Sequence, residues 1–326
     1  MKSRFMPIAV FAGFVALIIG VCHCTAEDAK NRVSMTETPY GYEIALDGKL
    51  FAGYRKDFNG TPIIWPVIGP NEKPMTRAYP MTEGVAGETK DHPHHRSIWF
   101  THDDINENKF WGGRSAIEHR EFLKSECDGK TATIVTKNHW LDNTTKNTIC
   151  SDIRTVTFGV IAESRYIDFD IVLTAEQGEV TISDTKEGTF AVRIPTSMDV
   201  DSKKNDPALG GTIINAEGLK DDKAWGKRSD WVDYSGPVEG ETAGIAIFNH
   251  PASFRYPTWW HVRTYGLFAA NPFGIKDFDP DLKTDGTVVL KKGESLQFYY
   301  RVILHTGDAN SLNLAQLYKD YAELKK

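Results

Sequence analysis

Residues 166–173 read Tyr-Ile-Asp-Phe-Asp-Ile-Val-Leu, and this stretch decides the expected fold because its apolar and polar side chains alternate. Successive side chains of a β-strand point to opposite faces, so a period of two is typical of a strand with one face on the core. The isoleucines and Phe169 would face the core, whereas Asp168 and Asp170 would face solvent. The stretch therefore predicts an antiparallel sheet, which can be solvated on one side.

Similar short runs recur along the chain and are separated by Gly, Pro, Asn and Asp, as at the expected turns Asp128-Gly129 and Asp285-Gly286. We find no repeat of fixed period and no low-complexity linker. This pattern predicts an all-β fold, a large antiparallel β-sandwich that forms a single domain over residues 27–326. The runs expected as strands are Tyr42–Leu46, Ile63–Ile68, Ile98–His102, Ala132–Trp140, Ile153–Val160, Tyr166–Leu173, Phe190–Ile194, Ala243–Phe248, Val262–Ala269, Thr287–Leu290 and Leu296–Leu304.

Helical spacing is convincing only at the C-terminus, where one amphipathic helix is expected. Two polar stretches, Asp201–Asp206 and Glu217–Lys227, are expected to be loops. The apolar side chains of the expected helix are Leu312, Leu314, Leu317, Tyr318, Tyr321 and Leu324.

The N-terminus has the layout of a secretory signal. Lys2 and Arg4 precede an apolar run, residues 6–21, and small residues follow it up to Ala26. A membrane anchor is the alternative, but the run is short for crossing a bilayer. We expect a signal peptide at residues 1–26 and a periplasmic or secreted protein with no membrane span after cleavage.

The net charge and the cysteines of the chain that would remain after cleavage indicate which partners and which bonds to expect. The net charge of −6 becomes −8 without Lys2 and Arg4, and this mild acidity argues against nucleic acid as a partner. Cys127 and Cys150 would be the cysteines of the exported chain. They flank an expected hairpin, and an oxidising compartment would allow them to form a disulfide.

The densest chemistry lies at residues 91–103, Asp-His-Pro-His-His-Arg-Ser-Ile-Trp-Phe-Thr-His-Asp, which hold four of the ten histidines. Imidazole exchanges protons near neutral pH and binds transition metals. Pro93 should hold His92 in an extended conformation, so that His92 and His94 share one side and His95 takes the other. The bland alternative is a His-rich surface turn before a buried strand.

We expect this stretch to line a site. His95 and His102 are candidate catalytic residues, and His92 and His94 are tentative metal ligands. The candidate substrate-binding residues here and just after are Arg96, Trp99, Asp103 and Trp111.

A second candidate wall lies in residues 258–271, Thr-Trp-Trp-His-Val-Arg-Thr-Tyr-Gly-Leu-Phe-Ala-Ala-Asn. With a period of two, Trp259, His261, Arg263 and Tyr265 would share one face, while the Trp260 face would be core. An aromatic plate, a proton carrier, a guanidinium and a phenol together suit a sugar. We therefore expect His261 to be catalytic and the other three to bind substrate. The alternative is a partly buried strand whose arginine pairs with an acid.

A third strand, residues 187–195, should place Glu187 and Arg193 on one face. Glu187 would act as a general base whose pKa is adjusted by the substrate-binding Arg193; a surface Glu–Arg pair is the alternative. His250, at a Pro-led turn, is a further candidate substrate-binding residue, whereas His119, His139 and His305 are expected to be structural.

Several of these motifs together resemble a bacterial family labelled methane oxygenase PmoA. The resemblance covers roughly residues 63–304 and implies an exported, strand-rich protein similar to the galactose-mutarotase-like supersandwich. A membrane methane monooxygenase subunit needs several apolar spans, which this chain lacks. The motifs, in order, are Tyr79-Pro-Met81, Asp91–Phe100, Phe110-Trp-Gly112, Phe248-Asn-His-Pro251, Trp259–Arg263 and Asn271-Pro-Phe-Gly274.

Three functions follow. The leading one is an exported carbohydrate-active enzyme, which would be a hydrolase, lyase or epimerase. It would act on a sugar or glycoside by acid–base chemistry of His and carboxylate side chains. Whether a divalent metal ion assists this chemistry is left open by the sequence. The second is a glycan-binding protein that grips the carbohydrate without turnover. The third is a metal-dependent oxygenase, as the family label suggests.

Overall fold

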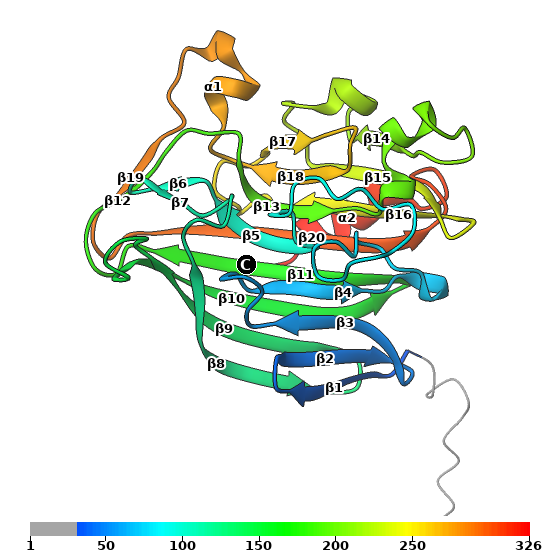
Figure 1. Cartoon of the computed structure of the whole chain (residues 1–326), viewed down its shortest axis with the longest axis horizontal. Coiled ribbons are helices and arrows are strands. Elements are labelled where there is room, and N and C mark those ends of the chain that lie inside the picture. The colour runs from blue at the N-terminus through cyan, green and yellow to red at the C-terminus, as the bar shows by residue number, and fades with distance from the viewer. Residues whose placement is uncertain (1–30) are drawn as a thin grey trace, which may run out of the picture. The chain divides into compact units, whose positions relative to one another are not determined.

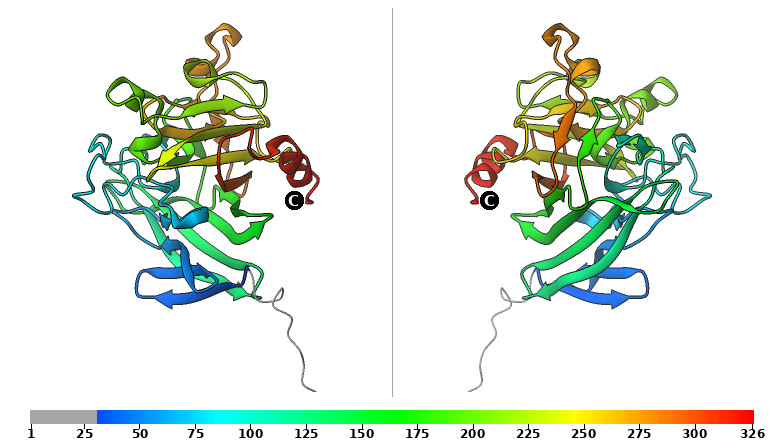
Figure 2. Two further views of the ribbon diagram at one scale, coloured as in Figure 1. Left: turned by 90° about the vertical axis from the view of Figure 1, so that its right-hand side faces the viewer. Right: turned by 90° about the vertical axis from the view of Figure 1, so that its left-hand side faces the viewer.

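Antiparallel sheets build residues 31–326, the part of the chain that the computed structural model describes. Two eight-stranded sheets form the sandwich and a four-stranded sheet lies beside them (Figure 1). Figure 2 shows the same sheets from two sides. This confirms the predicted all-β sandwich, while the predicted signal peptide lies outside the described residues.

The first sheet has the strand order β1, β2, β3, β4, β5, β13, β18, β17. Its strands are β1 (Val33–Thr38), β2 (Gly41–Leu46), β3 (Lys49–Arg55), β4 (Ile63–Val67), β5 (Ile98–His102), β13 (Gly188–Arg193), β17 (Trp259–Val262) and β18 (Leu267–Asn271).

The second sheet has the order β14, β15, β16, β20, β11, β10, β9, β8. Its strands are β8 (Ile117–Cys127), β9 (Ala132–Leu141), β10 (Thr148–Ile161), β11 (Ser164–Thr174), β14 (Thr212–Asn215), β15 (Trp231–Val238), β16 (Glu241–Asn249) and β20 (Ser295–Thr306). The four-stranded sheet consists of β6 (Asp104–Ile105), β7 (Asn108–Lys109), β12 (Val180–Ile182) and β19 (Val288–Leu290).

The main core lies between the two large sheets because each strand turns every second side chain inward. On β5 and β13, for example, Phe100, Phe190 and Val192 belong to this core together with Phe298 of the second sheet. Burying such side chains is the dominant favourable term in folding, at about 25 cal/mol per Å² of apolar surface.

The other face of β5, β13 and β18 carries a second, smaller apolar cluster, and this face positions the candidate site. Trp99 of β5 lies opposite Ala191 of β13, which lies opposite Ala269 of β18. The two alanines leave room for the indole, and Trp111 packs on it with ring centroids 5.2 Å apart.

Two helices lie outside the sheets, α1 (Ile275–Phe278) and α2 (Leu314–Ala322). Helix α2 confirms the predicted C-terminal helix and packs Tyr318 and Tyr321 on Phe248 of β16. It therefore covers the second sheet on the side away from the main core, as Figure 2 shows. No helix within residues 31–326 is long and apolar enough to cross a membrane.

All eleven predicted runs overlap strands, but one of them is two strands. Val262–Ala269 contains the turn between β17 and β18, because Gly266 adopts a φ of +97° and its amide donates to the Arg263 carbonyl at 3.0 Å. Short 3₁₀ helices overlap the loops predicted at 201–206 and 217–227, namely Val200–Lys204 and Asp221–Ala224.

One further prediction is wrong, and the disulfide that the sequence left open does not form. Asp168 is not a solvated position, because its carboxylate is mostly buried and accepts two hydrogen bonds from Arg301, at 2.6 and 2.7 Å. Cys127 and Cys150 are free thiols. They cannot pair, because Cys127 lies opposite Ala132 at one end of β9 and Cys150 lies opposite Trp140 near its other end.

Candidate functional site

A pocket of about 410 Å³ opens beside the Trp99–Trp111 cluster of the first sheet. Its volume is in the range of small-ligand pockets. Loops next to β5, β7 and β13 supply most of its wall, and the β17–β18 turn supplies one aromatic ring. The lining residues are His92, His94, His95, Asp103, Lys109, Trp111, Gly112, Arg114, Glu187 and Tyr265.

The histidines reach this pocket because the chain turns at Pro93, which corrects the predicted extended conformation. The amide of His95 donates to the carbonyl of His92 at 2.9 Å, and His92 has a φ of +44°. Proline favours the second position of such a turn because its ring fixes φ. His94 and His95 therefore line the same pocket rather than opposite faces, and strand pairing begins only at Ile98.

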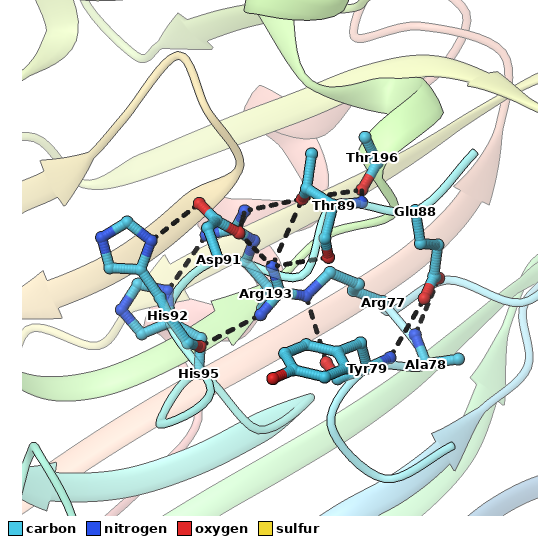
Figure 3. Close-up of polar contacts among 10 residues, drawn as sticks. All are labelled: Arg77, Ala78, Tyr79, Glu88, Thr89, Asp91, His92, His95, Arg193 and Thr196. Carbon is cyan, nitrogen blue, oxygen red and sulfur yellow. Dashed lines mark hydrogen bonds and ion pairs between the residues drawn. The ribbon is translucent and has the colours of Figure 1, made fainter. Parts of the chain in front are cut away.

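Asp91 holds together His92 of the pocket wall and two arginines behind it, Arg77 and Arg193, as Figure 3 shows. One carboxylate oxygen accepts from Arg193 at 2.8 Å and also pairs with Arg77, and the other accepts from Nδ1 of His92 at 2.7 Å. Burial alone would raise the pKa of Asp91, but the two guanidiniums and the His92 hydrogen bond lower it to about 2. The carboxylate is therefore ionised near neutral pH, and it leaves Nε2 of His92 free for a ligand.

His95 is held in one tautomer by Arg193. The guanidinium donates to Nδ1 of His95 at 3.1 Å, and arginine can only donate, so the imidazole proton must be on Nε2. Burial and the nearby positive charge of Arg193 lower the pKa of His95 well below its ordinary value. His95 is thus a neutral imidazole that can donate one fixed hydrogen bond.

Glu187 immediately precedes β13, and Asp103 immediately follows the antiparallel neighbour β5. The amide of Asp103 donates to the Glu187 carbonyl at 2.9 Å. The two carboxyl groups have different surroundings. Lys109 lies 3.4 Å from Asp103. Burial raises the pKa of Glu187, and the negative charge of Asp103 adds to this effect against the opposing charge of Lys186. Glu187 is therefore the carboxyl group of the pocket whose pKa is raised, which is a feature of proton-exchanging carboxyl groups in enzymes.

Aromatic rings form a parallel set beside these groups. His92 stacks on Tyr265 with centroids 5.1 Å apart and on His95 at 4.7 Å, and His95 stacks on Trp99 at 5.5 Å. The indole of Trp111 stands edge-on to His95 at 5.8 Å. The rings keep the imidazoles rigid and give the pocket an apolar wall.

His94 completes the wall as a second neutral imidazole. Burial lowers the pKa of His94 to about 4, and the charges of His92 and Arg96 contribute. Arg96 itself lies behind the pocket, where Nη1 donates to the carbonyls of Phe58 and Asn59, both at 3.3 Å. Arg96 thus supports the wall but does not line the pocket.

Five predicted site residues lie away from this pocket: His102, His250, Trp259, His261 and Arg263. Nε2 of His102 hydrogen bonds to the Ser183 carbonyl at 2.8 Å, and its ring packs on Phe273 in the buried interior. His250 hydrogen bonds to the Leu324 carbonyl at 3.0 Å, near the chain's C-terminus.

Trp259 and His261 are also buried, because they share the face of β17 that packs near α1. Trp259 clusters with Ile275 and Phe278, and the Nδ1 atom of His261 hydrogen bonds to the Lys186 carbonyl at 2.7 Å. The predicted sugar face of residues 259–265 therefore does not exist as a unit. Tyr265, at the turn, is its one member in the pocket.

Five residues of the site were not assigned a role from the sequence: Arg77, Asp91, Lys109, Gly112 and Arg114. Asp91 opens the His-rich stretch, and that adjacency is the signal that pointed to it. Arg77 carries no such signal, because it meets Asp91 only through the folded loop that precedes β5.

The residues tentatively assigned to a metal, His92 and His94, both line the pocket, with ring centroids 5.6 Å apart. Within residues 31–326 no group of three or more His, Cys, Asp or Glu side chains is arranged to hold a metal ion. The described residues therefore do not supply the third ligand that the tentative metal site requires.

Residues 41–319 match a family described as a family of unknown function, DUF6807. No curated protein sequence gives a significant match.

Among solved structures, the chain is similar to a galactose mutarotase-like protein from Clostridium acetobutylicum, with a TM-score of 0.40, 10% identity, and coverage of 85% of this chain and 99% of that one. It is also similar to the GH36 α-galactosidase AgaB from Geobacillus stearothermophilus, with a TM-score of 0.38 and 10% identity over 84% of this chain and 41% of that one. A polysaccharide lyase gives a TM-score of 0.33 and 13% identity over 85% of this chain and 33% of the lyase. These similarities are distant and assign no substrate to the chain.

Proposed function

We propose that this chain, which belongs to the DUF6807 family, is a carbohydrate-active enzyme that moves protons at a sugar bound in the pocket of Glu187 and His95. One observation carries the proposal. A carboxyl group whose pKa is raised by burial faces the same pocket as a neutral imidazole fixed as a donor and an imidazole backed by a carboxylate. Such paired and differently tuned groups are typical of general acid–base sites.

Sugar fits the walls of this pocket better than an apolar ligand. Asp103, Lys109 and Arg114 offer charged donors and acceptors for hydroxyl groups, and Trp111 and Tyr265 offer apolar surface for the C–H groups of the ring. A site that combines convergent polar groups with aromatic walls favours a ligand that has hydroxyls and C–H faces together.

In this scheme Glu187 exchanges a proton with a sugar oxygen. The Nε2–H of His95 stabilises negative charge as it develops on a neighbouring oxygen, because Arg193 already holds the imidazole in the donating orientation. Nε2 of His92 takes or returns the second proton, and Asp91 stabilises the imidazolium that forms. The same groups would serve ring opening, glycoside cleavage or elimination.

Glu187→Gln tests the proposal because it keeps the shape and removes the exchangeable proton. A panel of reducing monosaccharides and disaccharides would be examined for binding by calorimetry and for turnover by proton NMR. We expect Glu187→Gln to reduce turnover by about 10²–10⁴-fold while the dissociation constant changes far less. Glu163→Gln, at an exposed turn between β10 and β11, is the matched control and should behave as the parent.

Two results would contradict the enzyme proposal. Sugar binding without turnover in the parent would favour the glycan-binding protein. Stoichiometric metal that depends on His92 and His94, together with dioxygen consumption, would instead favour the metal-dependent oxygenase suggested by the resemblance to the PmoA-labelled family.

A further inference from the structure

A second pocket, of about 260 Å³, borders the turn between β17 and β18. It is lined by Asp222, Trp225, Val262, Arg263 and Thr264. Tyr265, the next residue along the chain, lines the first pocket. One short turn therefore contributes to both.

Arg263 connects the two pockets physically. Its guanidinium carbon lies 5.9 Å from the ring of Trp225 in the second pocket and 5.5 Å from the ring of Tyr265 in the first. These contacts orient the planar guanidinium. The side chain makes no hydrogen bond or ion pair with any residue of 31–326, which contradicts the sequence-based alternative that it pairs with an acid, and its donors remain available to a ligand.

Trp225 is a fixed and partly open surface. Its ring stands edge-on to Phe278 of α1 at 5.5 Å and to His261 of β17 at 6.3 Å, so two elements hold it in place. The residue is only half-buried, unlike Trp259 in the same cluster. The second pocket therefore combines the fixed indole of Trp225 with the guanidinium of Arg263 and the exposed carboxylate of Asp222. The first pocket has the same combination of aromatic surface with charged hydrogen-bond donors and acceptors.

We propose that this second pocket is an additional sugar-binding subsite, so that the ligand is a saccharide of at least two units. One unit occupies the pocket of Glu187, and the next crosses Tyr265 and Arg263 to reach Trp225. Arg263 would donate to oxygen atoms of the second unit, and Trp225 would contact its C–H face. The inference rests on the proposed function and adds the size class of the substrate to it.

The test compares monosaccharides with their disaccharides. Calorimetric titrations would use glucose and galactose against cellobiose, maltose and lactose, on the parent, Trp225→Ala and Arg263→Met. In the parent, at least one disaccharide should bind more tightly than its monosaccharide. Trp225→Ala should weaken that disaccharide by about tenfold, which corresponds to about 1.4 kcal/mol, and leave the monosaccharide within about twofold. Arg263→Met should act in the same direction.

Trp231→Ala is the matched control, because this indole is also half-buried but packs with the α2 cluster on the second sheet. It should change neither affinity, and circular dichroism would show that each variant is folded. If Trp225→Ala does not fold, Arg263→Met gives the same comparison without removing a packed ring.

The outcomes separate the two proposals. Binding of monosaccharide and disaccharide with equal affinity in the parent would overturn the second subsite and leave the proposed function standing. Equal weakening of both ligands in folded Trp225→Ala or Arg263→Met would also overturn it. Binding of no sugar by the parent would instead reject the proposed function, and the subsite with it.

Discussion

At the scale of single residues, the electrostatics of the pocket depend on two buried arginines that share one carboxylate. Arg77 and Arg193 are both almost fully buried, and both pair with the one carboxylate of Asp91. Burial and the charge of Arg193 lower the pKa of Arg77 to about 10. A buried guanidinium with a shared partner favours any additional negative charge nearby. This arrangement gives the neutral His95 an environment in which developing negative charge on a substrate oxygen is stabilised.

The first prediction at this scale concerns the pH dependence of turnover. The negative charge of Asp103 is one of the effects that raise the pKa of Glu187, after burial. Asp103→Asn removes that charge and should lower the pKa of Glu187. The limb of the pH–rate profile that reports Glu187 should therefore move to lower pH, whether the group acts as acid or as base. The measurement is kcat/KM across pH 4–9 for the sugar that the parent turns over.

Asp104→Asn is the control for this experiment. Asp104 also pairs with Lys109, at 2.9 Å, but it does not line the pocket and is not one of the groups that chiefly shift the pKa of Glu187. Its profile should match that of the parent. Superimposable profiles for Asp103→Asn and the parent would show that Glu187 does not carry the titration.

At the scale of elements, strands were predictable and the turns that build the site were not. The period-two runs of β5, β11 and β13 identify strands because their alternating side chains enter the main core. The turns at Pro93 and Gly266 each depend on a single residue. The alternation of side chains that is typical of a strand continues on both sides of these residues, so the sequence pattern does not show where the strand is interrupted. The alternating faces predicted for His92–Ser97 and Trp259–Tyr265 are therefore interrupted at these turns, although His92, His94, His95 and Tyr265 still line the pocket.

Strands at the sheet edges were also missed from the sequence. Strand β8 pairs only with β9 within its sheet and has mostly exposed side chains, Ile-Glu-His-Arg-Glu-Phe-Leu-Lys-Ser-Glu-Cys. Charged side chains on an edge strand discourage pairing with another chain. They also remove the alternation by which a strand is recognised, so β8 could not have been read from the pattern.

The prediction at the element scale concerns the β17–β18 turn. Gly266 has a φ of +97°, and an added Cβ would lie 3.2 Å from Ile194 and 3.5 Å from Nε of Arg193. Gly266→Ala should therefore lower the free energy of unfolding by about 1–3 kcal/mol. It should also weaken sugar binding, because the turn carries Tyr265 and Arg263. Urea unfolding and calorimetry measure the two effects.

A matched glycine separates backbone strain from the effect on the site. Gly240 joins β15 to β16 with a φ of +84°, and nothing lies within 4 Å of the position of its added Cβ. Gly240→Ala should cost about 1 kcal/mol and leave affinity unchanged. Unchanged affinity in Gly266→Ala as well would show that the turn does not position the ligand.

At the scale of the whole molecule, the fold class could be predicted because the period-two pattern is repeated in every part of the chain. Eleven runs that agree with one another outweigh an error at any single boundary. The candidate site has no such redundancy. Glu187 and His95 line one pocket, and Arg77 pairs with Asp91, only because β5 and β13 are neighbours in the first sheet and the loop before β5 folds over them. A contact between two segments that are far apart in the sequence cannot be predicted from the residues of either segment alone.

The prediction that belongs to the whole chain is export. Lys2 and Arg4, the apolar residues 6–21 and the small residues before Glu27 predict that the chain is cleaved during secretion. When the full-length sequence is expressed in a Gram-negative host, the periplasmic fraction should contain a chain whose intact mass corresponds to a start near Glu27. Leu17→Arg places a charge in the middle of the apolar run and should keep the uncleaved chain inside the cell, whereas Lys30→Arg, beyond the cleavage site, should be exported normally. Because the proposed substrate is a saccharide of two or more units, cleavage in the periplasm would put the pocket where such saccharides arrive from outside the cell. Recovery of the chain with Met1 still attached from the membrane fraction would contradict the signal peptide and favour the membrane anchor.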